Sequence, residues 1–236
     1  MDIIAEVGEV SSSDALDGLV AAIVSRLDAA GIVQAAVLAE GVSATVSLLL
    51  AARHPERVSR LLLAAPVGFP GPVTAGLRSD AEYAEVNRDV HLGTPERALA
   101  ALRALSRSDS FATVTRADDF RSAAKDETVR CAVERLAGWI ADGAFDMVRR
   151  QGPDVVRGVK KPVSLYWGRD DAWSTVDSAF FLTRRLSDVR LRVLSGCGHL
   201  VSLQAANLLG RSLARTVAGP QGTVGLDAEL GAVRTG

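Results

Sequence analysis

Short apolar runs alternate with helix-spaced apolar positions along the first 65 residues. Residues 2–7, 33–39 and 59–65 are short runs, and each predicts a buried strand. Between the first two, apolar side chains recur every three or four residues over about 14–30, which predicts a helix. An almost wholly apolar helix follows the second strand and runs past Leu50. This alternation predicts a parallel sheet with helices on both faces.

The pattern changes between residues 70 and 158, where segments with helical spacing follow one another without a convincing strand. Pro70 and Pro72 interrupt the chain, and the clearest helices are predicted at Arg97–Leu105 and Thr128–Ile140. This stretch reads as a helical insertion.

Strand and helix alternate again after residue 160. The pattern predicts strands at 162–168 and 190–194, a helix over about 174–187, and a last helix that ends near Thr216. The tail from Gly219 on is rich in glycine and small residues, so we expect it to be mobile. The predicted organisation is a core formed by 1–69 and 159–218, an insertion at 70–158 and a tail at 219–236.

The composition is that of a globular chain. The sequence has 236 residues, 48% hydrophobic and 23% charged, with a net charge of -1. That charge gives no electrostatic reason to expect nucleic acid or an anionic membrane surface as a partner. No apolar run approaches the roughly 18 residues needed to cross a bilayer. The acidic start lacks the basic region of a signal peptide, so we expect a cytoplasmic protein.

The two cysteines give no sign of a metal site or a disulfide. Cys131 and Cys197 form neither a metal-binding nor a disulfide pattern, and we expect no metal and no cofactor.

Candidate chemistry gathers where the strand at 33–39 turns into the next helix. The stretch AAVLAEGVSAT, continued by LLLAARHPERV and SRLLLAAP, resembles the nucleophile elbow of the α/β-hydrolase family with its following helix and strand. The resemblance implies a three-layer α/β/α fold with a mostly parallel sheet and a helical lid over 70–158. Counted back from His54, the position of the nucleophilic serine falls on Gly41, which has no side chain.

Two further matches imply the acid and the base of a catalytic triad. WGRDDAW resembles the family's strand-end W-G-x-x-D, which maps the acid to Asp171, with Asp170 as the adjacent alternative. GCGHLVSL resembles the family's G-x-G-H and maps the base to His199. The order elbow, acid, histidine is the order this fold uses. The resemblance implies that Asp171 orients His199, which accepts a proton.

The elbow leaves several assignments open. In a shifted register, GVSAT would make Ser43 the nucleophile; otherwise Ser43 caps the elbow helix or lines its first turn. The Val42 N–H remains from the family's oxyanion hole. Gly41, Val42 and Trp173 are expected to border the substrate. Glu40 is interpreted as a structural or pocket-floor residue.

The family's first strands have no counterpart here, because the sequence begins where its fourth strand would lie. Either residues 2–7 pair directly beside 33–39, or another chain fills the gap. An exposed edge strand invites pairing, so a homodimer is expected.

Three functions remain open. The first is an enzyme that acts on a small organic molecule by general base catalysis at His199 and Asp171, as a hydrolase, lyase or cyclase. The second is an inactive binding or interaction protein on the same fold. The third, weaker hypothesis is a serine esterase that uses Ser43.

Overall fold

Four parallel strands form one sheet in the computed structural model, which describes residues 11–69 and 79–218. Their spatial order β1-β2-β3-β4 is also their chain order. The strands are β1 (Ala35–Glu40), β2 (Val58–Ala64), β3 (Val163–Gly168) and β4 (Val189–Leu194). Because every pair is parallel, all four carboxyl ends lie at one edge of the sheet. The predicted α/β class is confirmed, whereas the strand expected at 2–7 and the tail at 219–236 lie outside the described residues.

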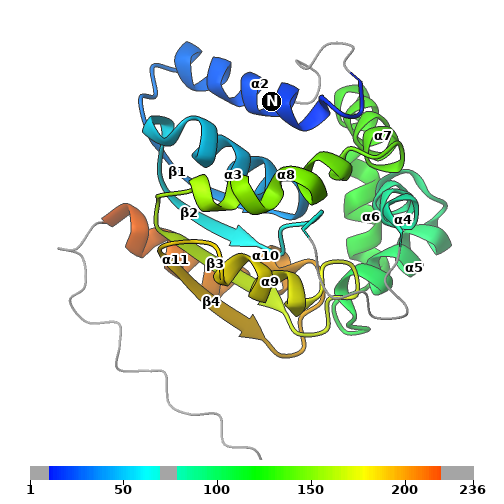
Figure 1. Ribbon diagram of the computed structural model, residues 1–236. Helices are drawn as coiled ribbons and strands as arrows, with labels where there is room; N and C mark the ends of the chain where they lie inside the picture. The colour runs from blue at the N-terminus through cyan, green and yellow to red at the C-terminus, as the bar shows by residue number, and fades with distance from the viewer. Residues whose placement is uncertain (1–10, 70–78, 219–236) are drawn as a thin grey trace, which may run out of the picture.

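Helices cover the sheet (Figure 1). α3 (Gly41–Arg53) packs on β1 and β2, and α2 (Ala15–Ala29) and α8 (Phe145–Gly158) lie on either side of it. The short helix η1 (Pro55–Arg57) leads from α3 into β2. α9 (Val176–Thr183) packs on β3 and β4, and α11 (Ala206–Ala218) packs on β1. The prediction of one last helix was wrong, because the backbone breaks at Ala205 between α10 (Val201–Gln204) and α11.

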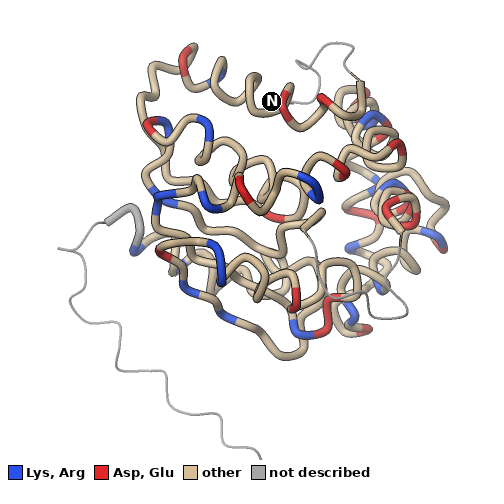
Figure 2. Tube along the Cα trace, viewed as in Figure 1, with Lys and Arg blue, Asp and Glu red and all other residues tan. Residues whose placement is uncertain are grey.

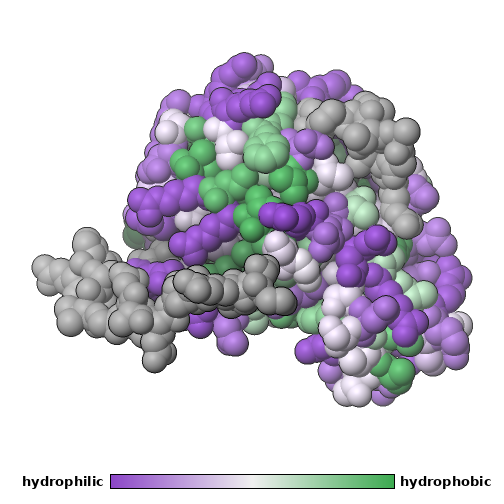
Figure 3. Space-filling model, turned by 90° about the horizontal axis from the view of Figure 1, so that it is seen from below, coloured by the Kyte–Doolittle hydropathy of each residue, from purple (hydrophilic) through white to green (hydrophobic). Residues whose placement is uncertain are grey.

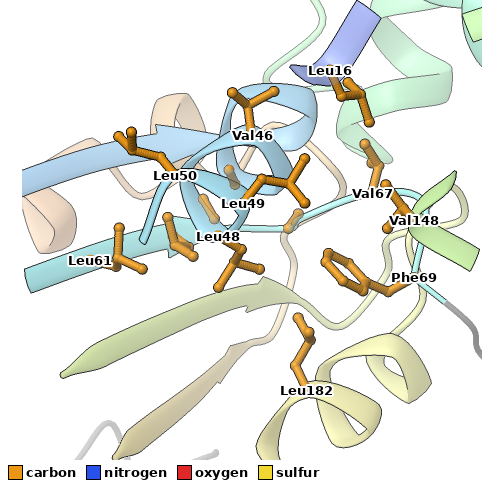
Figure 4. Packing of buried hydrophobic residues seen from close by; sticks show 14 of the residues in the cluster. Leu16, Val46, Leu48, Leu49, Leu50, Leu61, Val67, Phe69, Val148 and Leu182 are labelled. Carbon is orange, nitrogen blue, oxygen red and sulfur yellow. The ribbon is translucent and has the colours of Figure 1, made fainter. Parts of the chain in front are cut away.

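The central helix α3 is apolar on almost every side because it is enclosed by the sheet and by two other helices. Leu48, Leu49 and Leu50 are at most 1% exposed, and Figure 4 shows them close to side chains of β2 and of the loop that follows it. Burying each such side chain contributes roughly 1.5–3 kcal/mol. This packing fixes α3 against the sheet.

A helical insertion follows β2, as predicted. It consists of α4 (Asp80–Leu92), α5 (Pro95–Ser106), α6 (Val114–Ala123) and α7 (Glu127–Ala141). α4 packs against the other three, and the group has its own apolar cluster, which includes Val90, Leu102 and Leu105. Figure 1 shows the insertion beyond the carboxyl ends of the strands. The expected lid segment also contains α8, which packs beside α3 instead.

The surface carries both signs of charge. Figure 2 shows acidic and basic residues spread over the helices and loops, and the ion pair of Arg57 with Asp28 is one of several. Figure 3 shows an apolar area bordered by hydrophilic residues on the side where β4 and α9 lie in Figure 1. No helix within 11–69 and 79–218 is long and apolar enough to cross a membrane.

Candidate active site

The chain turns sharply where β1 ends and α3 begins. Glu40 is extended (φ -132°, ψ 149°), and Gly41, the first residue of the helix, has φ +57°. This left-handed conformation favours glycine, which has no Cβ to clash. Ser43 caps the turn, because its Oγ donates a hydrogen bond to the Glu40 carbonyl (2.7 Å) and accepts one from the Glu40 N–H (3.2 Å). Gly41 therefore lies at the carboxyl edge of the sheet, facing the insertion.

An acid and a histidine meet at the same edge. Asp171 follows β3 and His199 follows β4, and the Asp171 Oδ2 lies 2.8 Å from the His199 Nδ1. The other Asp171 oxygen accepts hydrogen bonds from the backbone N–H groups of Trp173 (2.8 Å) and Ser174 (3.0 Å). Both side chains are almost fully buried. Asp171, and not the exposed Asp170, is the partner of this histidine.

A close approach of backbone to backbone holds the histidine loop in place. A Cβ on Gly168, the last residue of β3, would overlap the carbonyl oxygens of Gly198 and Cys197. The His199 N–H donates to the Leu105 carbonyl of the insertion (2.7 Å). The loop that carries the histidine is therefore fixed both by the sheet and by α5.

A tyrosine that the sequence reasoning missed completes the constellation. Tyr83, in the first turns of α4, places its hydroxyl 2.9 Å from the His199 Nε2. Its ring is buried, meets the imidazole edge-on at a centroid distance of 5.4 Å, and lies 5.8 Å from the ring of Trp173. With Asp171 accepting from Nδ1–H, the neutral imidazole accepts the tyrosine hydrogen at Nε2. The described chain thus contains a continuous series Tyr83–His199–Asp171.

Gly41 lies against this series. A Cβ built on Gly41 would be 3.5 Å from the His199 Nε2 and 3.3 Å from the Tyr83 hydroxyl oxygen. A side chain at position 41 would point at the base, and it would compete with Tyr83 for the same space.

The environment shifts the titration of these groups. Burial disfavours the charged form of His199, but the charge and hydrogen bond of Asp171, with the charge of Glu40, outweigh it and raise the pKa of the histidine. Burial, together with the Asp171 and Glu40 charges, raises the pKa of Tyr83 far above its ordinary value. The phenol therefore keeps its proton, and the imidazole is a stronger base than an exposed one.

Glu40 is a second carboxyl group beside the site. The Ser202 N–H donates to one of its oxygens and the Ser202 hydroxyl to the other, both at 2.6 Å. Burial raises the pKa of Glu40, although these two hydrogen bonds act in the opposite direction. Glu40 links the end of β1 to α10, which agrees with the structural role expected for it.

Two cavities border α4. One, of about 90 Å³, lies between α4 and α7 and has Val42, Tyr83, His91 and Ile140 among its walls. The other, of about 390 Å³, lies between α4 and α5 and is bordered by Trp173 and by polar residues that include Arg97. The expected substrate-bordering residues Val42 and Trp173 thus face different cavities.

The structure brings some of the candidate residues together and separates one. Gly41, Asp171 and His199 converge, whereas the hydroxyl of the exposed Ser43 is engaged with the Glu40 backbone. Within the described ranges, no Ser43–His199 hydrogen bond is formed and no group of three His, Cys, Asp or Glu side chains could hold a metal ion.

The parallel sheet, the turn at Gly41 and the insertion define an α/β-hydrolase fold, and solved structures agree. A serine hydrolase from the polyaromatic-hydrocarbon-degrading bacterium Cycloclasticus zankles has a TM-score of 0.71 at 22% identity, over 89% of this chain and 72% of that one. The 2-hydroxy-6-oxo-6-phenylhexa-2,4-dienoate hydrolase of Rhodococcus sp. strain RHA1 has a TM-score of 0.64 at 18% identity, over 89% and 73%. At these identities the likeness shows the fold.

Sequence similarity leads toward one group of hydrolases. A 2-hydroxymuconate semialdehyde hydrolase of Pseudomonas putida is 25% identical over 189 residues, which are 78% of this chain and 63% of that protein. A protein of the same name from Pseudomonas sp. (strain CF600) is 25% identical over 187 residues. The chain spans less than two thirds of the length of these relatives. No family model matches the sequence.

Proposed function

We propose that this protein is an α/β-hydrolase-like enzyme that acts on a small organic molecule by general base catalysis without a serine nucleophile. In this proposal Gly41 stands where the family has its nucleophilic serine, and His199 with Asp171 supplies the base. The supporting observation is the buried 2.8 Å contact of Asp171 with a histidine whose Nε2 lies 3.5 Å from where a Cβ on Gly41 would be.

The chemistry follows from this pair. The imidazole takes a proton from a water molecule or from the substrate, and the carboxylate stabilises the imidazolium that forms. General base catalysis of this kind contributes about 10²–10⁴ to a rate. It suits hydrolysis by an activated water, elimination, or cyclisation driven by proton transfer, so hydrolase, lyase and cyclase reactions all fit.

The relatives suggest the first compound to test. Their name specifies 2-hydroxymuconate semialdehyde, a small organic acid, and we propose a molecule of that class as the substrate. Its turnover is to be followed by the loss of its absorbance and by product analysis. We expect His199→Ala to abolish turnover and the matched control Ser43→Ala to leave it unchanged. Equal turnover rates in wild type and His199→Ala would refute the proposal.

A binding protein on the same fold is the second candidate. It is favoured by the lack of a side chain at Gly41 and by Tyr83, which already occupies the His199 Nε2. A compound that raises the melting temperature but is recovered unchanged after long incubation would support this alternative.

The weaker alternative, a serine esterase that uses Ser43, has a direct test. Labelling with a fluorophosphonate probe is read by intact mass in wild type and in Ser43→Ala. A single adduct that the mutation removes would restore the esterase hypothesis. We expect no adduct on Ser43, because the Ser43 hydroxyl is bound to the Glu40 backbone and not to a base.

The setting and assembly remain proposals as well. We propose a cytoplasmic protein whose partner is the small-molecule substrate, without nucleic acid or membrane. We also propose a homodimer through β1, an edge strand of the described sheet on which Leu38 is 40% exposed. A monomer mass in light scattering would argue against the dimer.

A further inference from the structure

Tyr83 connects a cavity to the catalytic base. Tyr83 is one of the residues that line the 90 Å³ cavity, and its hydroxyl is bonded to the His199 Nε2. His199 itself is not among the residues that line this cavity. A molecule in the cavity would meet the tyrosine before it met the imidazole.

The geometry resembles a catalytic triad in which a tyrosine supplies the hydroxyl group. A hydroxyl lies within hydrogen-bond reach of a base, at 2.9 Å, and the base is oriented by a carboxylate at 2.8 Å. This is the arrangement by which enzymes activate a hydroxyl group. We infer that Tyr83 is a catalytic residue that relays a proton between the bound substrate and the His199–Asp171 pair. This inference rests on the proposed function and names the group that touches the substrate.

The proposed relay moves one proton from the substrate to the histidine and leaves the tyrosine unchanged. In the forward direction the phenol oxygen of Tyr83 accepts a proton from the substrate while the phenol proton passes to the His199 Nε2. The result is a deprotonated substrate, an unchanged tyrosine and an imidazolium that is stabilised by Asp171. In the reverse direction the imidazolium returns a proton through Tyr83 to a substrate oxygen or carbon. No other reactant is needed.

The surroundings of Tyr83 fit this role. Its ring is held between Phe145 (6.3 Å) and Trp173 (5.8 Å), so the hydroxyl has a fixed position. The helix that carries it is anchored one turn earlier, where the Ser79 hydroxyl accepts from the Glu82 N–H and the Glu82 carboxylate accepts from the Ser79 N–H. The group is therefore positioned in advance, which is what rapid proton transfer requires.

The cavity limits the class of substrate. Its volume of about 90 Å³ is well below the roughly 300–1,000 Å³ of typical ligand pockets, so it suits a compact molecule or the compact end of a longer one. Its walls combine apolar residues, which include Val42, Leu136 and Ile140, with the polar residues Asn87, Arg88 and His91. We therefore expect a substrate that presents a compact group with one acidic proton or one proton-accepting oxygen to Tyr83, in a cavity with both apolar and polar walls.

Methanesulfonyl fluoride, a probe with few atoms, tests the relay without knowledge of the substrate. In the reaction the Tyr83 oxygen bonds to sulfur, the S–F bond breaks, fluoride leaves and the phenol proton passes to the His199 Nε2. Adducts are located by peptide mapping of the full chain. The only other tyrosine, Tyr166, is also buried and is an internal control.

We expect wild type to be labelled at Tyr83 and not at Tyr166. The variant His199→Gln keeps a hydrogen-bonding side chain but has no base. Its labelling rate should be lower than that of wild type by a factor of about 100 or more. Tyr83→Phe, which keeps the ring, should lose about 10²-fold or more of the turnover of 2-hydroxymuconate semialdehyde. No adduct at Tyr83, or equal labelling rates in wild type and His199→Gln, would overturn the relay.

The turnover assay separates the two proposals. Full activity in Tyr83→Phe together with none in His199→Ala would overturn the relay and leave the proposed function standing. Full activity in His199→Ala would instead overturn the proposed function, whatever the labelling of Tyr83 shows.

Discussion

A serine placed at Gly41 should become reactive if the tyrosine hydroxyl is removed at the same time. The double variant Gly41→Ser/Tyr83→Phe tests how the site is built. A Cβ on Gly41 points at the His199 Nε2 from 3.5 Å, so the hydroxyl of the new side chain can reach this nitrogen. The Tyr83 oxygen now bonded to that nitrogen lies 3.3 Å from the same Cβ, and the second substitution removes it.

The cost to stability can be worked from the backbone. Position 41 has φ +57°, and a residue with a Cβ in the left-handed region costs roughly 1–2 kcal/mol. We expect Gly41→Ser alone to lower the free energy of unfolding by about this amount, with an addition from the tight contact to Tyr83. In the Tyr83→Phe background the loss should be smaller, because the contact is gone. Urea denaturation of the four proteins of this cycle measures the coupling.

The gain in reactivity is the sharper readout. Loss of the serine or the histidine of a complete triad costs on the order of 10⁶ in rate in a serine protease, so supplying the missing hydroxyl should have a large effect. We expect a fluorophosphonate to add once to Gly41→Ser/Tyr83→Phe, at position 41. The adduct should persist with Ser43→Ala added and disappear with His199→Gln added. No adduct, or an adduct on Ser43, would refute this account of the site.

Three further predictions concern the surrounding structure. Gly168→Ala should prevent native folding or strongly lower the melting temperature, because its Cβ would overlap the Gly198 carbonyl; wild-type thermal stability would contradict this close approach. Thr45→Val should lower the free energy of unfolding, measured by urea denaturation, by about 1–3 kcal/mol. The Thr45 hydroxyl accepts a hydrogen bond from the Val67 N–H (3.0 Å) and donates one to the Val67 carbonyl (2.7 Å), and an unchanged denaturation midpoint would show that these bonds do not stabilise the fold. Glu40→Gln should flatten the pH dependence of stability. The raised pKa of Glu40 means that its contribution to stability is present below the unfolded pKa and is lost as the pH rises through the folded pKa. The free energy of unfolding of the variant should therefore rise relative to that of wild type as the pH increases above 4.5, and a difference that is constant with pH would refute the shift.

The sequence was sufficient for those parts of the site that lie in one continuous segment. The turn at Gly41 could be predicted because the strand, the small residues and the apolar helix follow one another directly. The partners Asp171 and His199 could be proposed because WGRDDAW and GCGHLVSL, two short continuous motifs, resemble those that carry the acid and the base in the α/β-hydrolase family. The structure agrees with this assignment, because the carboxyl ends of the neighbouring parallel strands β3 and β4 meet at one edge and bring the two side chains together.

Tyr83 could not be predicted in the same way. It is separated from His199 by 116 positions, and the segment around it reads as an ordinary helix. Its contact with the imidazole depends on where the whole of α4 is docked, which apolar periodicity does not specify. The break at Ala205 has the same origin. Just before it, the Gln204 side chain accepts from the Gly198 N–H and donates to the Ser106 carbonyl, and both partners lie outside the helix that the spacing predicts.

Gly41 and Tyr83 are best understood as one feature. The glycine at position 41 leaves room for the phenol that bonds the His199 Nε2 at 2.9 Å, since a Cβ there would lie in tight contact with the phenol oxygen, at 3.3 Å. The base still has a hydroxyl beside it, but this hydroxyl comes from the insertion and not from the turn after β1. On our proposal the reaction therefore depends on the docking of α4 as much as on the sheet. A substitution that displaces this helix should impair proton transfer even when the Asp171–His199 pair is intact.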